Sequence, residues 1–211
     1  RKGEMENMGV QIKICGLMRE ADIRYVNRLR PEYAGFVFAP GSRRYVSDEE
    51  AGYLSSLLEP GIVPVGVFVN EDPERVADLL NRGSIRMAQL HGQEDEGYMV
   101  RLRKRTAAPL IKAFSIETRE DAKRAADSGA DYILLDQGGG GTGESFDWHL
   151  AAGLKRPWFL AGGLNCENIG RALQAAAPWG VDVSSGVETA GKKDGEKIAC
   201  FVSLVRRGKR E

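Results

Sequence analysis

The sequence predicts an α/β protein that folds as a single (β/α)8 TIM barrel, and two features support this prediction. Short apolar runs alternate along the chain with amphipathic stretches of helical character, at a spacing of roughly two dozen residues. Eight such runs are present, and a helical stretch follows each one. Eight strand–helix units match a closed parallel barrel, whereas an open doubly wound sheet often has fewer strands.

The elements follow one another without interruption. Strands are expected over 10–15, 33–39, 62–69, 85–90, 109–114, 131–136, 157–161 and 179–184. Helices are expected over 19–30, 48–58, 73–82, 94–105, 117–128, 147–153, 165–176 and 195–206. Capping sequences precede three of these helices, at 47–50, 72–74 and 117–121. No low-complexity linker separates the units, so we expect one catalytic domain over 10–211. The polar residues 1–9 are expected to be a disordered or added leader, since they lack the apolar core of a signal peptide.

Composition narrows the class of partner. The 211 residues are 42% hydrophobic and 28% charged, with 30 Lys and Arg against 30 Asp and Glu. Zero net charge argues against nucleic acid or a membrane surface as a partner, and no apolar run approaches the roughly 18 residues that span a bilayer. Cysteines 15, 166 and 200 lack metal-ligand spacing. We therefore expect no metal, reduced thiols and a cytoplasmic protein.

Alternation along the strands predicts a polar barrel interior. Polar side chains recur on one face of several expected strands while the apolar ones face the helices; the polar set is Lys13, Cys15, Gln89, His91, Lys112, Asp136, Asp182 and Ser184. Buried charges need partners. Because the first and last strands become neighbours when a barrel closes, we expect a contact between Lys13 and Asp182.

Two residues at strand ends are the candidates for catalysis. Cys15 ends the first strand beside Gly16, and Asp136 ends the sixth. The carboxyl ends of barrel strands are where such proteins place their chemistry. A thiolate can act as a base, and the preceding run 133–135 suggests apolar surroundings that favour a protonated Asp136. A buried structural cysteine and a capping or ion-paired aspartate are the alternatives.

Glycine-rich stretches follow the last three strands and predict a phosphate site. The loops after strands seven and eight of such barrels often bind phosphate through backbone N–H groups. The expected contacts are Gly141, Thr142, Gly143, Gly162, Gly163, Ser184 and Ser185. None of the three stretches ends in the Gly-Lys-Ser/Thr of a nucleotide loop. The ligand is therefore expected to be a small phosphorylated metabolite.

Three further residues are candidates for substrate contact. Arg44 follows the second strand, where a guanidinium can bind a carboxylate, although a solvated loop arginine is an equal alternative. His91 ends the fourth strand and is expected to line the pocket without carrying protons. Asp182 is expected to be structural or orienting.

The ordered motifs together resemble the phosphoribosylanthranilate isomerase family. They are KICG at 13–16, GFVF at 35–38, SRRY at 42–45, VGVFVN at 65–70, QLHG at 89–92, LLD at 134–136, GGTG at 140–143, FDW at 146–148, AGGL at 161–164 and VDVSSGVE at 181–188. Each motif alone is weak, but the resemblance keeps its order from about residue 11 to the end of the chain.

The resemblance implies the Amadori rearrangement of N-(5-phosphoribosyl)anthranilate in tryptophan biosynthesis, without a cofactor. By similarity, Asp136 protonates the furanose ring oxygen and opens the sugar to a Schiff base, and Cys15 removes the proton from C2′. Arg44 corresponds to the contact with the anthranilate moiety, and the glycine and serine loops hold the 5′-phosphate.

Three alternatives remain at this point. A related isomerase of histidine biosynthesis, or a dual-substrate version, resembles the chain but uses an aspartate where Cys15 stands. A Schiff-base aldolase would use Lys112, and a non-catalytic barrel would bind the metabolite as a sensor. We expect a monomer or a weak homodimer.

Overall fold

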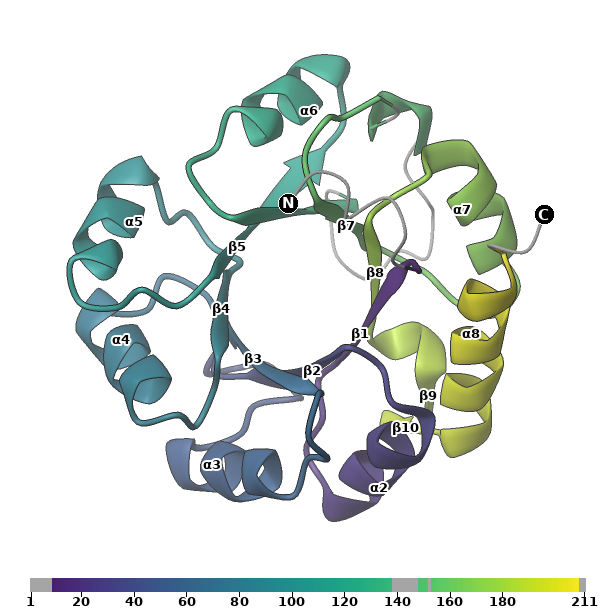
Figure 1. Cartoon of the computed structure of the whole chain (residues 1–211), viewed down its shortest axis with the longest axis horizontal. Helices are drawn as coiled ribbons and strands as arrows, with labels where there is room; N and C mark the ends of the chain where they lie inside the picture. Colours follow the sequence, from purple (N-terminus) through teal and green to yellow (C-terminus); the bar gives the residue numbers. More distant parts are fainter. Residues whose placement is uncertain (1–8, 138–147, 152, 209–211) are drawn as a thin grey trace.

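Eight parallel strands close into a barrel in the computed structural model, which describes residues 9–137, 148–151 and 153–208. Each strand pairs with the next, and β8 pairs with β1 (Figure 1). The strands are β1 (Gln11–Cys15), β2 (Tyr33–Val37), β3 (Val63–Phe68), β4 (Met87–Leu90), β5 (Leu110–Ile116), β6 (Tyr132–Gln137), β7 (Trp158–Leu160) and β8 (Gly180–Val183). The predicted (β/α)8 barrel is therefore confirmed, and every expected strand is present.

Helices form an outer ring around the barrel (Figure 1). They are α2 (Glu20–Leu29), α3 (Asp48–Ser56), α4 (Pro73–Asn81), α5 (Glu96–Arg103), α6 (Arg119–Ala126), α7 (Ile169–Ala176) and α8 (Gly195–Arg207). In the described part of the chain, none of them is both long and apolar enough to cross a membrane. Residues 1–8 of the expected leader lie outside the described residues.

The predicted caps set the starts of three helices. The Ser47 hydroxyl accepts a hydrogen bond from the N–H of Glu50, and the Glu50 carboxylate accepts one from the N–H of Ser47. Thr118 and Asp121 repeat this capping box before α6. Asp72 accepts from Glu74 N, and Pro73 occupies the first helical position of α4. The polar side chains satisfy N–H groups that have no partner within the first turn.

Two of the expected helices differ from the structure. Among the described residues of 147–153, only a 3-10 turn forms, η1 (Trp148–Ala151), and Gly153 follows with φ +87°. The expected helix over 165–176 begins only at Ile169. Its first residues are held in a turn because the Asn165 side chain accepts from the N–H groups of Glu167 and Asn168.

A short antiparallel hairpin between β8 and α8 was not expected from the sequence. After the 3-10 turn η2 (Ser185–Val187), strand β9 (Glu188–Thr189) pairs with β10 (Lys192–Lys193). Ala190 and Gly191 form the turn with φ values of +50° and +75°. This hairpin lies between α2 and α8 in Figure 1 and leads directly into α8.

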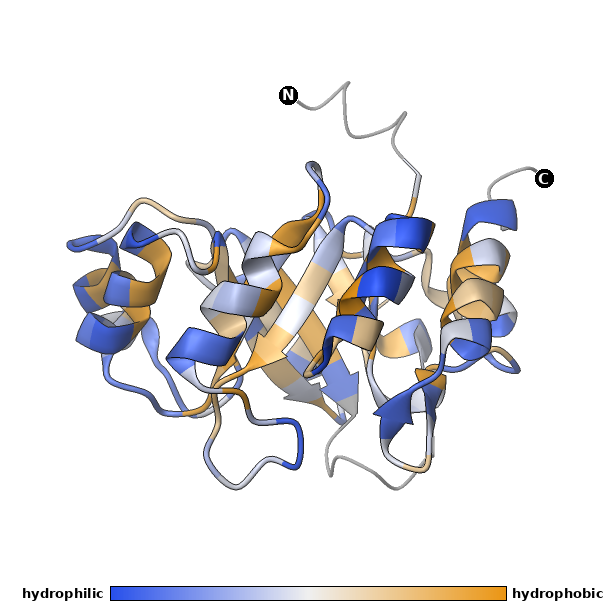
Figure 2. Cartoon of the chain, turned by 90° about the horizontal axis from the view of Figure 1, so that it is seen from below, coloured by the Kyte–Doolittle hydropathy of each residue, from blue (hydrophilic) through white to orange (hydrophobic). Residues whose placement is uncertain are grey.

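The hydrophobic core has two layers. The larger one lies between the strands and the helices, where apolar residues concentrate (Figure 2). The smaller one fills the barrel with one or two side chains from each of β2 to β7 and the residue after β7: Tyr33, Val65, Met87, Ile111, Ala113, Leu134, Phe159 and Ala161. Aromatic contacts close it on one side, with ring centroids of Phe159 and Trp179 5.1 Å apart. The interior is therefore a packed floor beneath the site.

The ion pair predicted inside the barrel is confirmed. Lys13 and Asp182 are register partners on β1 and β8, and Lys13 Nζ lies 2.9 Å from Asp182 Oδ1. The Lys13 side chain is fully buried. Burial opposes its charge, but Asp182 and Cys15 outweigh burial, so the pKa of Lys13 lies above its ordinary value.

The expectation for Lys112 is wrong. Ile111 and Ala113 fill the barrel, so Lys112 between them points outward. Its ammonium donates to Gly92 O at 2.8 Å and to Glu94 Oε2 at 3.1 Å. The alternation of this strand places Lys112 on the helix-facing side, where the buried carboxylate of Glu94 compensates its charge.

Candidate active site

A cavity of about 680 Å³ opens at the carboxyl end of the barrel. Its lining contains the two catalytic candidates, Cys15 from β1 and Asp136 from β6. It also contains the predicted contact residues Arg44, His91, Asp182, Gly162, Gly163, Ser184 and Ser185. The structure thus brings together every predicted site residue that it describes. Gly141, Thr142 and Gly143 lie outside the described residues.

The Cys15 thiol is buried beside charged groups. Its residue is 7% exposed, and burial raises the pKa of the thiol above its ordinary value. Lys13 and Lys193 act in the opposite direction, whereas the carboxylate of Asp182 adds to the rise. Gly35, its register partner on β2, leaves room for the sulfur: a Cβ there would lie 2.7 Å from Sγ. Burial therefore keeps the Cys15 thiol protonated, whereas the ammonium groups of Lys13 and Lys193 stabilise its thiolate form.

Asp136 lies next to His91 in the cavity lining. His91 Nε2 lies 3.6 Å from Asp136 Oδ2, and the Asp136 side chain is 25% exposed. On its other side the imidazole is held by Gln89, whose Nε2 lies 2.8 Å from Nδ1. With the amide donating, Nδ1 accepts, and the proton of a neutral imidazole then lies on Nε2, toward Asp136. The carboxyl is thus partly open to the cavity and has a polar neighbour, not the apolar surroundings expected from 133–135.

Arg44 is fixed by a buried carboxylate. Its Nε and Nη2 donate to the two oxygens of Glu188 at 2.6 and 3.0 Å. The stem of the side chain lies on Gly16, where a Cβ would come 2.3 Å from Arg44 Cδ. Gly16 also has φ +80°, which a side chain disfavours. The guanidinium therefore has a defined orientation in the cavity lining, with donors left over for an anion.

The two described glycine and serine loops touch each other. A Cβ on Gly186 would lie 1.9 Å from Leu164 O, so only glycine allows this approach. Gly162 and Gly163 have φ values of +86° and +64°, and the Asn168 amide donates to Gly163 O at 2.9 Å. Residues 162–163 and 184–186 thus form one continuous part of the cavity lining. Such a concave backbone surface suits a phosphate group.

Sequence reasoning assigned no role to the residues that support the site. Glu188 and Lys193 form a buried ion pair, Oε1 to Nζ, of 2.7 Å, and Gln89 is buried under His91. Glu188 belongs to the 181–188 motif, and Gln89 had been placed on the same face as His91. Nothing in the sequence indicates that Lys193 is buried, because a charged segment such as 192–197 is typical of a solvated surface.

Among the described residues, no group of three or more His, Cys, Asp or Glu side chains is arranged to hold a metal ion. Lys112 is outside the cavity lining and paired with Glu94, so the lysine that a Schiff-base aldolase would need does not face this site.

Comparison with known proteins adds a family match to this geometry. Residues 12–204 match the family model of N-(5'phosphoribosyl)anthranilate (PRA) isomerase. The N-(5'-phosphoribosyl)anthranilate isomerase of Endomicrobium trichonymphae is 44% identical over 200 residues, which cover 93% of this chain and 98% of that protein.

Solved structures agree with the sequence match. A phosphoribosyl anthranilate isomerase in complex with reduced 1-(o-carboxyphenylamino)-1-deoxyribulose 5-phosphate is 37% identical, with a TM-score of 0.84 over 94% of this chain and 99% of that one. A structure of monomers generated from the dimeric enzyme of Thermotoga maritima is 36% identical, with a TM-score of 0.83 over 94% and 99% of the two chains.

Proposed function

Since this chain belongs to the N-(5'-phosphoribosyl)anthranilate isomerase family, we propose that it catalyses the Amadori rearrangement of N-(5-phosphoribosyl)anthranilate in tryptophan biosynthesis. The product is 1-(2-carboxyphenylamino)-1-deoxyribulose 5-phosphate. The observation that carries this proposal is that Cys15 and Asp136, on strands β1 and β6, line one cavity at the carboxyl end of the barrel.

Asp136 is the general acid. Its carboxyl is partly exposed to the cavity and lies next to His91. Proton transfer from Asp136 to the furanose ring oxygen breaks the C1′–O bond and leaves an iminium between C1′ and the anthranilate nitrogen. The cation at this nitrogen acidifies the C–H bond at C2′, which prepares the substrate for a modest base.

Cys15 is the general base. Its thiolate takes the proton from C2′, the C–H electron pair forms the C1′–C2′ double bond, and the iminium becomes an enolamine. Tautomerisation of the enolamine gives the ketose product. Lys13 and Lys193 favour the anionic form of a thiol that burial keeps protonated. We therefore expect kcat/KM to rise with pH through the titration of this thiol.

The remaining residues hold the two ends of the substrate. Arg44, with its orientation fixed by Glu188, is positioned to bind the anthranilate carboxylate. Gly162, Gly163, Ser184 and Ser185 supply N–H and hydroxyl donors for the 5′-phosphate. We assign Gly141, Thr142 and Gly143 to the same phosphate on the resemblance alone. Asp182 holds Lys13 at the cavity floor.

Turnover by the purified chain tests the function. The fluorescence of N-(5-phosphoribosyl)anthranilate should decay on addition of the protein, and the ketose product should appear in equal amount. A barrel that only binds the metabolite would change the fluorescence at once without forming product. Assay of the corresponding aminoaldose substrate of histidine biosynthesis separates the related isomerase, for which we expect at most a minor activity.

Location and assembly are further parts of the proposal. A biosynthetic isomerase with free cysteines fits the cytoplasm. We propose a monomer or a weak homodimer, which sedimentation at several concentrations would distinguish from a tight oligomer.

A further inference from the structure

A buried cluster of charges lies beneath the cavity rim, between Arg44 and Cys15. At its centre the Glu188 carboxylate, 4% exposed, accepts from Arg44, from Arg43 Nη2 at 2.9 Å and from Lys193 Nζ at 2.7 Å. Burial opposes the charge of Glu188, but Arg44 and Lys193 lower its pKa to about 2. The carboxylate is therefore ionised at neutral pH and holds all three cations.

Lys193 connects this cluster to the strand that carries the thiol. Its ammonium, 1% exposed, donates to Ser184 O at 2.9 Å and to Ser184 Oγ at 3.3 Å. Ser184 Oγ in turn donates to the carbonyl oxygen of Cys15 at 3.0 Å. A continuous chain of polar contacts thus joins Arg44, Glu188, Lys193, Ser184 and Cys15.

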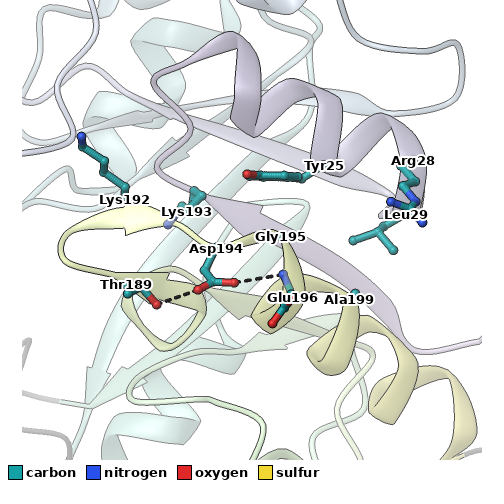
Figure 3. A pocket seen from close by; sticks show the side chains of 10 residues that line it. All are labelled: Tyr25, Arg28, Leu29, Thr189, Lys192, Lys193, Asp194, Gly195, Glu196 and Ala199. Atoms are coloured by element: carbon teal, nitrogen blue, oxygen red, sulfur yellow. Dashed lines mark hydrogen bonds between the residues drawn. The ribbon is translucent and has the colours of Figure 1, made fainter.

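The hairpin that carries Glu188 and Lys193 is anchored from both sides. Arg19 Nη2 donates to Lys193 O at 3.0 Å, and Lys197 Nζ donates to Glu188 O at 2.8 Å. On its outer side, the Asp194 carboxylate bonds to Thr189 and to the N–H of Glu196 (Figure 3). These residues line a separate cavity of about 640 Å³, and the exposed Lys192 belongs to its lining (Figure 3).

From these contacts we infer that the buried pair of Lys193 and Glu188 is a positioning device of the active site. Lys193 holds Ser184 and stabilises the anionic form of Cys15, and Glu188 orients Arg44 toward the substrate. The inference rests on the roles proposed above for Cys15 and Arg44. It adds two residues that act through others and do not touch the substrate.

The charges around Cys15 determine how the pair of Lys193 and Glu188 affects the pKa of the Cys15 thiol. Lys13 on β1 and Lys193 on β10 favour the thiolate, and Asp182 on β8 opposes it. Both cations have a carboxylate partner, Lys13 with Asp182 and Lys193 with Glu188, so removal of Lys193 leaves Lys13 as the one of these two cations that still favours the thiolate. The Lys193→Met variant keeps the apolar stem, and Glu188 keeps two arginine partners.

The test measures thiol reactivity and turnover separately. The rate of Cys15 alkylation by iodoacetamide is followed against pH by peptide mass spectrometry, which separates Cys15 from Cys166 and Cys200. In Lys193→Met, we expect the midpoint of this profile to rise by about one pH unit, and kcat/KM at pH 7 to fall by about tenfold or more. Lys192→Gln on the same hairpin is the matched control and should leave the alkylation midpoint and kcat/KM unchanged.

Glu188→Gln should give a different pattern. Loss of its negative charge does not raise the Cys15 midpoint, but a loosened Arg44 should raise KM by about tenfold with a smaller change in kcat. A folded Lys193→Met variant with the wild-type alkylation profile would overturn the inference, as would a Glu188→Gln variant with wild-type KM.

Two further arms keep the test decisive. If Lys193→Met does not fold, Lys193→Arg retains the charge, and its Cys15 midpoint should stay within a few tenths of a unit of the wild type; a large rise would overturn the inference. A wild-type chain that lacks isomerase turnover would refute the proposed function. The alkylation profiles of the variants do not depend on turnover and would still report on the pair.

Discussion

Gly35→Ala is a direct perturbation of the thiol's position. Gly35 pairs with Cys15 across β1 and β2, and an added Cβ would lie 2.7 Å from Sγ, 3.0 Å from Cα and 3.2 Å from Cβ of Cys15. Ordinary contacts between such atoms begin near ~3.5 Å. Since one of the crowded atoms is backbone, rotation of the Cys15 side chain cannot relieve the overlap, and the sulfur must move by about 1 Å.

The size of the effect follows from this crowding. Overpacking of this kind destabilises a protein by about 1–3 kcal/mol, which lowers the Tm of a chain of this length by about 2–12 °C. A displacement of about 1 Å in a reacting group is expected to lower kcat/KM by about a hundredfold. Activity should therefore fall far more than the fraction of folded protein at 25 °C.

Calorimetry and the fluorescence assay together check this prediction. Gly170→Ala in α7 is the control, because nothing lies within 4 Å of its added Cβ, and it should raise stability by about 0.5–1 kcal/mol with unchanged turnover. Wild-type kcat/KM in a folded Gly35→Ala protein would refute the placement of the reactive sulfur against β2.

Three other perturbations have defined outcomes. Lys13→Met leaves the carboxylate of Asp182 buried without its partner, so urea unfolding should show a loss of about 3–5 kcal/mol, partly recovered in Lys13→Met/Asp182→Asn; an unchanged midpoint would contradict this. The pKa of Glu188 is about 2 in the folded protein against 4.5 ordinarily. The stability that its charge adds to the fold is therefore complete above pH ~4.5 and is lost as pH falls toward 2. The free energy of unfolding should therefore change less between pH 5 and pH 3 in Glu188→Gln than in the wild type. An equal change in both proteins would argue against a lowered pKa of Glu188 in the folded state. Arg44→Lys cannot keep the two-point contact with Glu188 and should raise KM at least tenfold, measured by steady-state turnover; an unaltered KM would remove Arg44 from substrate binding.

Strand alternation predicted much of the site. It placed Lys13 beside Asp182 across the closure of the barrel, and it placed Cys15 and Asp136 at strand ends that open into the same cavity. These predictions succeed because side-chain direction in a strand has a period of two and all parallel strands end on one side.

The same reasoning failed where a shift of one residue changes the face of the strand on which a side chain lies. It also failed for strands of only two residues. Lys112 lies one position away from the barrel-facing Ile111 and Ala113, so polarity alone assigned it to the wrong face. The two-residue strands β9 and β10 carry no periodic pattern. The burial of Lys193 depends on Glu188 and Ser184, whose approach only the folded chain determines.

We propose that Cys15 and Asp136 act on one substrate as base and acid. The most direct test of this proposal is the kcat of Cys15→Ser and Asp136→Asn, each compared with the wild type in the fluorescence assay after circular dichroism has confirmed folding. Loss of either group should lower kcat by about 10²–10⁴-fold. A folded variant of either kind that turns over at a rate near that of the wild type would contradict the account.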